Sequence, residues 1–395
     1  MTDFDDFGID TDHEYMTAES YSEKHFLKSG DILFARTGAT VGKTYYYDGS
    51  IGMAVFAGYC IRFRFDTKKV LPKFVYWCTK TSSYANWVKG IQRPSGQPNI
   101  NKEEYKSYEI VLPELDIQRR LVQIMDEAAN KRALKLRQAD EIVDNAKIEA
   151  FTSIGISFPE YTPSLFNYIT LADAREYGFS CNPHSNYLNK LLEELKSNRE
   201  YKGHLSNYID VNPATKKTEL EKDTEVSFVP MSAVSELINY AEYEIRKYSE
   251  VKTGFTNFKR GDLLWAKITP CMQNGKSFIA QEMPTEIGFG STEFHVLRIK
   301  SGKEDEIYMP YLWMLLSERH ILEAAQGMFS GSAGQQRVSD IFLKNFPVVL
   351  PEFEIQRKLA NRVLMALNKS AALKKEAETD WQNAKEQFEK ELLGE

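Results

Sequence analysis

Apolar residues recur at alternating spacings of three and four in two long stretches of this chain. The first stretch, residues 114–151, contains neither glycine nor proline. Its apolar positions are Ile117, Leu121, Ile124, Ala128, Leu136, Ala139, Val143, Ala146 and Ala150. The second stretch runs from Glu352 to about Leu393, with apolar positions Ile355, Leu359, Val363, Ala377, Trp381, Ala384 and Phe388. This spacing predicts two long helices of the coiled-coil type.

Shorter segments in front of each helix have a different pattern. A Gly-Asp turn precedes the strand-like residues 32–36, and residues 45–47 and 53–65 are rich in the β-branched and aromatic residues typical of strands. Residues 74–88 have helical spacing. In the second half, residues 226–231 and the segment after Gly261-Asp262 again favour strands. These patterns predict mixed α/β globular modules.

The chain also repeats itself. Residues 112–121 read LPELDIQRRL and residues 350–359 read LPEFEIQRKL, with seven of ten positions identical. GDLLWAK answers GDILFAR, and FSGSAGQQRV answers IQRPSGQPNI at the same offset of 238 as the helices. The protein is therefore interpreted as two copies of one plan, a module followed by a long helix. The expected segments are residues 1–113, 114–154, 155–350 and 351–395.

Composition narrows the class of protein. The 395 residues carry a net charge of −6, and no apolar run reaches the length of about 18 residues that spans a bilayer. The acidic first residues exclude a signal peptide, and the four cysteines lie far apart without metal-ligand spacing. We expect a cytoplasmic protein without a membrane segment, a metal site or disulfides.

The average charge hides a gradient. Residues 1–23 carry eight acidic residues and no Lys or Arg, whereas residues 24–113 carry 14 Lys/Arg against six Asp/Glu. A locally basic module is compatible with phosphate contacts. An unevenly charged solvated surface fits the numbers equally well.

No catalytic signature is found. GATVGKT (residues 38–44) resembles a phosphate-binding loop, but only three residues separate its glycines and the matching second segment lacks the first glycine. Nucleotide hydrolysis is therefore disfavoured. Asn212-Pro213-Ala214-Thr215 breaks the methyltransferase motif at its second proline. We expect no catalytic residue in this chain.

The Gly-rich loops of both modules instead suit DNA. The candidate DNA-binding residues are Arg36, Lys43, Arg93, Gln97, Lys267, Lys276, Gln335, Gln336 and Arg337, with Asn99 near them. Arg reads guanine, and Gln or Asn reads adenine, through paired hydrogen bonds in the major groove, while lysines bind phosphates. Each residue alone is more often simply an exposed polar side chain. Their recurrence in both repeats favours the group.

GDILFARTGATVGK, the Gly-Gln loops and the two LPE-x-x-IQR helix starts resemble the specificity subunits of type I restriction-modification systems. The resemblance covers most of the chain. It implies sequence-specific binding of double-stranded DNA by two target-recognition domains, each reading half of a bipartite target. It also implies that the two helices form an antiparallel coiled coil that spaces the two domains.

Partners and cofactors follow from the same resemblance. It implies that the chain holds two DNA adenine methyltransferase subunits and that motor-nuclease (restriction) subunits can join the complex. S-adenosylmethionine is expected on the methyltransferase, and no cofactor is expected in this chain. The alternative hypothesis is a coiled-coil scaffold whose modules bind protein and have no DNA specificity.

Two further expectations concern geometry. Ala139, Val143 and Ala146 should face Ala377, Trp381 and Ala384 along one seam, because small side chains leave room for Trp381. The first module is N-terminally short, since Tyr21-Ser22-Glu23 aligns with Tyr248-Ser249-Glu250. The counterpart of residues 158–227 is then missing from it, and the second module should dominate recognition.

Overall fold

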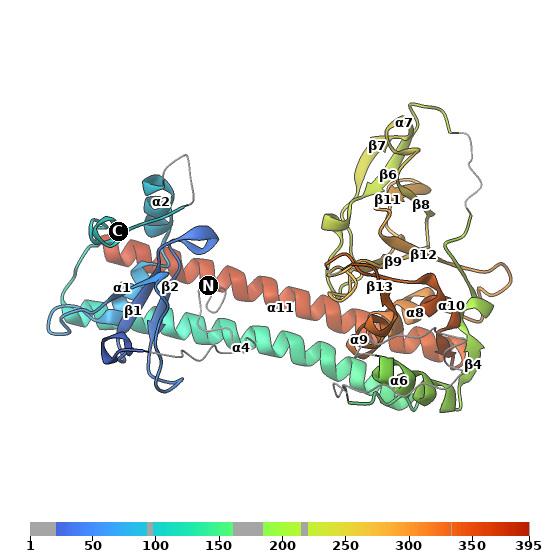
Figure 1. The fold of residues 1–395 in the computed structure, drawn as a ribbon, viewed down its shortest axis with the longest axis horizontal. Coiled ribbons are helices and arrows are strands. Elements are labelled where there is room, and N and C mark those ends of the chain that lie inside the picture. Colours follow the sequence, from blue (N-terminus) through green and yellow to red (C-terminus); the bar gives the residue numbers. More distant parts are fainter. Residues whose placement is uncertain (1–20, 93–97, 161–184, 215–219, 333, 395) are drawn as a thin grey trace. The chain divides into compact units, whose positions relative to one another are not determined.

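The structure, a computed structural model, describes residues 21–92, 98–160, 185–214, 220–332 and 334–394 (Figure 1). It divides into two compact units. Unit 1 comprises residues 1–140 and 371–395, and unit 2 comprises residues 141–370. The division falls inside both long helices, whereas the four segments expected from the sequence end near helix termini. Those segment boundaries stay predictions.

Unit 1 places helices against one face of a small antiparallel sheet with strand order β2-β1-β3. Its elements are η1 (Glu23–His25), β1 (Asp31–Ala35), η2 (Gly38–Thr40), β2 (Thr44–Tyr47), β3 (Cys60–Phe63), α1 (Pro72–Cys78), α2 (Ser82–Ile91), α3 (Lys102–Lys106) and parts of α4 (Leu115–Ser153) and α11 (Phe353–Leu393). Alternate residues of β1 face opposite sides. Ile32 and Phe34 pack with the helices, and Leu33 and Ala35 pack with β2.

Unit 2 contains the remaining parts of α4 and α11 and a larger mixed α/β fold. Its other elements are α6 (Ser185–Ser197), β4 (Tyr201–His204), η3 (Leu205–Asn207), β5 (Ile209–Val211), β6 (Glu225–Val229), η4 (Met231–Ala233), β7 (Glu244–Lys247), α7 (Tyr248–Val251), β8 (Thr256–Lys259), β9 (Leu263–Ala266), β10 (Ser277–Ile279), β11 (Ile287–Gly290), β12 (Phe294–Ile299), α8 (Met309–Leu316), α9 (Arg319–Ala325), η5 (Gln326–Met328), β13 (Phe329–Ser330), β14 (Arg337–Val338), α10 (Asp340–Asn345) and β15 (Pro347–Val349).

Two four-stranded sheets organise unit 2. One has the order β10-β9-β12-β5 and is antiparallel throughout, and the other has the order β7-β6-β11-β8 with β6 and β11 parallel. Strand β9 is built like β1. Leu263 and Trp265 pack with α8, and Leu264 and Ala266 pack on the opposite side. The prediction of mixed α/β modules is confirmed.

The three strands of unit 1 have counterparts in unit 2, where β9, β10 and β12 correspond to β1, β2 and β3. In unit 2 this sheet continues from β12 to β5, and β4 pairs with β15. In the described part of unit 1, β3 is the last strand of its sheet, and residues 109–111 form no strand. Val349 is fully buried, whereas its counterpart Val111 is half exposed.

The two predicted long helices are present. Helix α4 has 39 residues and α11 has 41. A left-handed glycine ends α4: Gly155 has φ 71°, and the N–H of Ile156 donates to the carbonyl of Phe151 at 2.9 Å. This hydrogen bond is the one that satisfies carbonyl groups at a helix C-terminus.

Ion pairs connect the two helices within each unit. In unit 1 they join Arg120 to Glu391 at 3.0 Å, Lys131 to Asp380 at 2.8 Å and Lys374 to Asp140 at 2.8 Å. In unit 2, Arg362 pairs with Glu149. In unit 1, residue numbers thus rise along α4 as they fall along α11. These pairs are exposed, so each contributes at most about 1 kcal/mol.

The expected register of the apolar seam is wrong. Trp381 belongs to the unit 1 core that also contains Leu121 and Met125, and its ring lies 5.8 Å from the ring of Trp77. Ala146 belongs instead to the core of unit 2, with Leu359 and Val363. Periodicity shows which stripe of a helix is buried, but it does not show how far one helix is displaced along the other.

The stripe itself also differs at the start of both helices. Ile117 and Ile355 were expected in the seam, but 39% and 41% of these side chains are exposed. Their neighbours Gln118 and Gln356 are buried instead, at 0% and 1% exposure. A buried amide is costly unless its hydrogen bonds are made, so these two glutamines must have partners.

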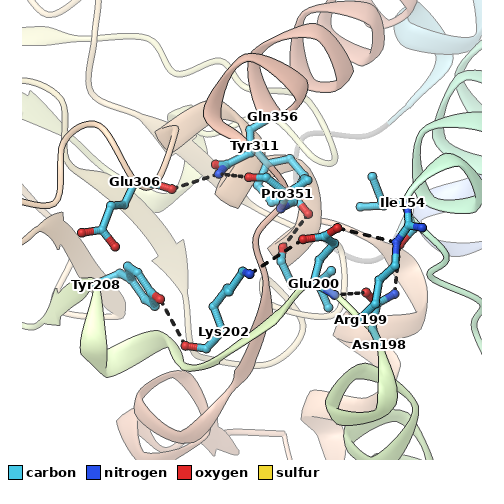
Figure 2. A network of polar contacts seen from close by, with 11 residues as sticks. Ile154, Asn198, Arg199, Glu200, Lys202, Tyr208, Glu306, Tyr311, Pro351 and Gln356 are labelled. Carbon is cyan, nitrogen blue, oxygen red and sulfur yellow. Dashed lines mark hydrogen bonds and ion pairs between the residues drawn. The ribbon is translucent and has the colours of Figure 1, made fainter.

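Both glutamines make the same three hydrogen bonds. Gln356 Nε2 donates to the carbonyls of Glu306 (2.9 Å) and Pro351 (2.8 Å), as Figure 2 shows. The Oε1 of Gln356 accepts from the N–H of Tyr308 (2.9 Å). Tyr308 is the N-cap of α8, which begins with Met309 and Pro310.

In unit 1, Gln118 Nε2 donates to the carbonyls of Lys69 (3.1 Å) and Pro113 (2.8 Å), and its Oε1 accepts from the N–H of Leu71 (2.8 Å). Leu71 is the N-cap of α1. In each unit one glutamine therefore ties the start of a long helix to the start of a module helix. We call this arrangement the glutamine clamp.

Replacing Gln356 with alanine should lower the free energy of unfolding by about 2–4 kcal/mol, because three hydrogen bonds are lost and buried backbone groups are left unpaired. Urea denaturation measures the change, and hydrogen exchange of the Tyr308 amide reports it locally. The control is Arg357→Ala, which removes only an exposed pair with Glu354 and should cost less than about 0.5 kcal/mol. Equal effects of the two variants would show that the clamp does not stabilise unit 2.

Candidate nucleic-acid interface

The Gly-Asp turns anchor the strands that lead to the candidate loops. Asp31 and Asp262 are each 2% exposed. Asp31 accepts from the N–H of Lys28 at 2.9 Å and pairs with Arg64 at 2.6 and 2.9 Å. Gly30, with φ 92°, supplies the left-handed backbone of the turn.

Unit 2 repeats these contacts. Asp262 accepts from the N–H of Lys259 at 2.7 Å and pairs with Arg298 at 2.8 and 2.6 Å. Arg298 lies on β12, and Arg64 directly follows β3. The aspartates therefore hold the sheet together at one end of β1 and β9. The candidate residues follow the opposite end of these strands.

In each unit, the segment after the strand pairs with the Gly-Gln loop. Isolated β-bridges join Thr37 to Asn99 and Ile268 to Arg337. In unit 1, the N–H of Ile100 donates to the carbonyl of Arg36 at 2.9 Å. We call these two segments together the loop pair: residues 36–43 with 98–100 in unit 1, and residues 267–276 with the described residues of 329–338 in unit 2.

The backbone contacts of the unit 2 loop pair match those of unit 1. The N–H of Val338 donates to the carbonyl of Lys267 at 2.9 Å, and the N–H of Thr269 donates to the carbonyl of Gln336 at 3.0 Å. In consequence Lys267, Gln336 and Arg337 lie together, although about 70 residues separate them in sequence.

Buried tyrosines hold the loop pair of unit 1. The Tyr105 hydroxyl donates to the carbonyl of Ala35 at 2.6 Å and accepts from the N–H of Gly42 at 3.1 Å. Burial raises the pKa of Tyr105 to about 12, so the hydroxyl stays protonated near neutral pH. Gly42 has φ 87°, and an added Cβ would lie 2.7 Å from Val88 Cγ1. Only glycine fits at this position.

The candidate cations of both loop pairs are partly exposed. Lys267 and Lys43 have no side-chain partner within the described residues, and Lys276 has only a long contact of 3.4 Å to the carbonyl of Met231. The Nε of Arg36 is buried without a hydrogen-bond partner among the described residues. Such cations are available to anionic ligands. Arg93 and Gln97 lie outside the described residues.

Arg337 differs from these cations because it has a partner. Its Nε and Nη2 donate to Glu293 at 2.9 and 2.7 Å, and its Nη1 donates to the carbonyl of Gln335 at 3.0 Å. The hydrogen bond from Arg337 holds the pKa of Glu293 below its ordinary value. The side-chain amides of Gln335 and Gln336 have no partner within the part of the chain that is described.

A buried histidine connects the loop pair of unit 2 to β12. His295 Nε2 lies 2.9 Å from the carbonyl of Val338, and its Nδ1 lies 3.0 Å from Nδ2 of Asn212. A carbonyl only accepts, so Nε2 carries the proton and Nδ1 accepts from the amide. Burial lowers the pKa of His295. Neutral His295 therefore donates to the carbonyl of Val338 and accepts from the side-chain amide of Asn212.

Metal ligands, cysteines and membrane-spanning helices were also sought among the described residues. No group of three or more His, Cys, Asp or Glu side chains among them could hold a metal ion. Cys78 and Cys271 are free thiols, whereas Cys181 lies outside the described residues. No described helix is both long enough and apolar enough to cross a membrane.

A family model for the type I restriction modification DNA specificity domain matches residues 8–143 and 205–379. This chain belongs to that family. The resemblance inferred from the repeated motifs is thus confirmed, and the two matched stretches together cover most of the chain.

Two relatives from Escherichia coli are named as specificity subunits. The type I restriction enzyme EcoEI specificity subunit is 39% identical over 148 residues, covering 37% of this chain and 24% of the relative. The EcoAI specificity subunit is 34% identical over 191 residues, which cover 48% of this chain and 31% of the relative. The chain therefore matches about a quarter to a third of the length of these relatives.

Three solved structures resemble this family member over most of its length. One, described as the basis of complex assembly and conformational transition of the type I R-M system, has 15% identity and a TM-score of 0.49, covering 93% of this chain and 81% of its own. The HsdS subunit from Thermoanaerobacter tengcongensis has 16% identity and a TM-score of 0.37, and the match covers 93% of this chain and 80% of that subunit. The S subunit from M. genitalium has 17% identity and a TM-score of 0.40, and the match covers 92% of this chain and 83% of that subunit.

Several residues that support the loop pair of unit 2 were not predicted from the sequence. Glu293, His295 and Asn212 lie far from the Gly-rich loops in sequence, and no motif marks them. The two Gly-Asp aspartates were recognised as part of a repeat but not as ion-pair partners. Both aspartates recur in two modules that have otherwise diverged, and this recurrence was the signal in the sequence that they have a structural role.

Unit 2 should lose stability as the pH falls below 6.5, the ordinary pKa of histidine. The folded protein binds a proton at His295 less tightly than the unfolded chain does, so protonation favours unfolding, while stability above pH 6.5 is unaffected. Urea midpoints at pH 7.5 and 5.5 test this. His295→Gln should reduce the difference between the two midpoints, and His25→Gln in unit 1 should not. An undiminished difference in the first variant would contradict the assignment.

Proposed function

We propose that this chain is the DNA-reading subunit of a type I restriction-modification complex and that its two units read the two halves of a bipartite target. The main support is that both units have the same loop pair, joined by an equivalent β-bridge, with different residues at equivalent positions. Lys267, Arg337 and Glu293 of unit 2 correspond to Arg36, Asn99 and Tyr59 of unit 1. A common scaffold with different loop residues suits two ligands of one chemical class.

The cations and amides would have separate roles. Lys43, Lys267 and Lys276 carry charge without a strong partner, and they would bind phosphates. Gln335 and Gln336, with the outlying Gln97, would bind base edges, as would the arginines Arg36, Arg93 and Arg337. The net charge of −6 does not oppose this role, because the loop pairs contain five Lys and Arg residues and no acidic residue.

The long helices would assemble the complex. We propose that they form one antiparallel coiled coil, which would set the distance between the two half-sites. The ion pairs between α4 and α11 support this arrangement, because in unit 1 they show the two helices running in opposite directions. No cofactor is proposed for this chain.

The helix starts support two equivalent docking positions. Ile117 and Ile355 are exposed, and next to them lie matching ion pairs, Asp116 with Arg119 at 2.5 Å and Glu354 with Arg357 at 3.0 Å. The glutamine clamp explains why the buried residues recur in both repeats, but it does not explain why these exposed residues recur. Binding of one copy of the same partner at each helix start would explain their recurrence. By family, the partner would be a DNA adenine methyltransferase that binds S-adenosylmethionine, and restriction subunits would join this complex.

A DNA selection tests the proposal. The full chain, purified with its methyltransferase, is incubated with a library of randomised duplexes, and the retained sequences are read. We expect enrichment of a two-part motif with a fixed gap, matching the adenine methylation pattern of the host genome, in which the half-site of unit 2 is the better defined. Retention without any enriched motif would instead favour a protein-binding scaffold.

Lys267→Gln and Lys276→Gln should weaken binding of all duplexes equally and make the salt dependence shallower by about one unit each. Gln336→Ala should instead change preference at particular bases by about 1–3 kcal/mol. Titrations of the enriched duplex at several salt concentrations measure both effects. The control, Lys369→Gln on α11, removes the same charge outside the loop pair. If all variants behave like this control, the loop pair does not face DNA.

A further inference from the structure

We propose that Glu293 is a specificity-determining residue of unit 2: it holds Arg337 in a fixed orientation for reading a guanine in one half-site. The inference rests on the proposed DNA-reading function and assigns a role to a carboxylate that would otherwise repel DNA. An acidic residue beside a phosphate-binding surface weakens binding. Its presence there requires a compensating role.

The geometry of the ion pair suits such a role. Both carboxylate oxygens of Glu293 accept from Arg337, and one further N–H goes to the carbonyl of Gln335. A guanidinium has five N–H groups, so two stay without a partner within the described residues. Arg337 remains 41% exposed, and Glu293 is 22% exposed. Glu293 therefore occupies the Nε–Nη2 edge of the guanidinium, and one N–H on each of Nη1 and Nη2 stays without a partner among the described residues.

Neighbouring contacts hold both partners in place. The carbonyl of Glu293 accepts from the N–H of Lys267 at 2.9 Å, and its N–H donates to the hydroxyl of Ser291 at 3.2 Å. The hydrogen bond of His295 fixes Val338, which follows Arg337 in the chain. Arg337 is thus oriented before any ligand arrives, which reduces the conformational entropy that binding costs.

The charge balance favours selectivity over general attraction. The hydrogen bond from Arg337 keeps Glu293 ionised near neutral pH. The pair is therefore close to neutral, and Lys267 supplies the unpaired positive charge beside it. A neutralised arginine adds little to sequence-independent phosphate binding, but it still offers two N–H groups to a pair of acceptors. Guanine presents O6 and N7 in this arrangement, which is the commonest partner of arginine in the major groove.

The loop pair of unit 1 has different residues at the positions of this ion pair. Tyr59 occupies the position of Glu293, since the carbonyl of Tyr59 accepts from the N–H of Arg36 at 2.9 Å. Asn99 occupies the position of Arg337 in the β-bridge. An asparagine amide matches adenine rather than guanine. The oriented arginine should therefore distinguish the half-site of unit 2 from that of unit 1.

The test compares Glu293→Gln with wild type in the full methyltransferase complex. The probes are the duplex enriched from the randomised library and a scrambled duplex of the same composition. Glu293→Gln should bind the scrambled duplex more tightly, steepen its salt dependence by about one unit and lower the ratio of the two affinities about tenfold. A repeated selection should lose preference at one guanine. Glu282→Gln, which removes an exposed carboxylate elsewhere in unit 2, is the charge control.

Arg337→Lys provides a second variant. It keeps the positive charge but loses the paired N–H groups, so discrimination at the same guanine should fall while the salt dependence changes little. If Glu293→Gln proves unstable by urea denaturation, Arg337→Lys supplies the test. The inference is overturned if the wild type discriminates and both variants keep its base preferences. If the wild type itself selects no motif, the proposed function fails instead.

Discussion

One buried glutamine ties each long helix of this protein to the module that precedes it. Gln118 and Gln356 lie at the first turns of α4 and α11, and each bridges the proline before its helix to the N-cap of a module helix. A fully buried amide must satisfy both its donors and its acceptor, so it tolerates one arrangement of the surrounding backbone. This constraint sets the direction in which the helix leaves the module.

The same constraint explains why the helix starts are so alike in the two repeats. The Leu-Pro-Glu segment supplies the accepting carbonyl, and the glutamine needs a fixed place one turn later. The module helices differ in sequence but not in what the glutamine requires, which is a backbone N–H and a carbonyl. Side chains of the module can therefore diverge while the clamp is kept. The Gly-Asp turn works in the same way at the sheet, where Asp31 and Asp262 demand only a backbone N–H and an arginine.

The glutamine clamp and the Gly-Asp turn depend little on the side chains of the loop pairs. The side chains of the loop pairs can therefore vary without loss of these contacts. Their backbone pairing is the same in both units, and the side chains at equivalent positions are not. In unit 2 a carboxylate, an arginine and a histidine form one connected set, Glu293, Arg337 and His295. In unit 1, the hydroxyl of Tyr105 bonds to the backbone of Ala35 and Gly42 and so holds the corresponding loop. A scaffold with fixed backbone positions and variable side chains is well suited to recognising related ligands.

The sequence by itself determined the repeat, the two long helices, the α/β class of the modules and the family, because motifs and periodicity are local properties. It also brought the Gly-rich loops together as candidates, since they recur at equal offsets. Only the tertiary structure decided the register between α4 and α11, since Trp381 belongs to the core that contains Leu121 and not to the core that contains Ala146. Only the structure placed Gln118 and Gln356 inside and Ile117 and Ile355 outside, and paired Arg337 with Glu293. These outcomes depend on which backbone groups and charges from distant segments meet, and no local pattern carries that information.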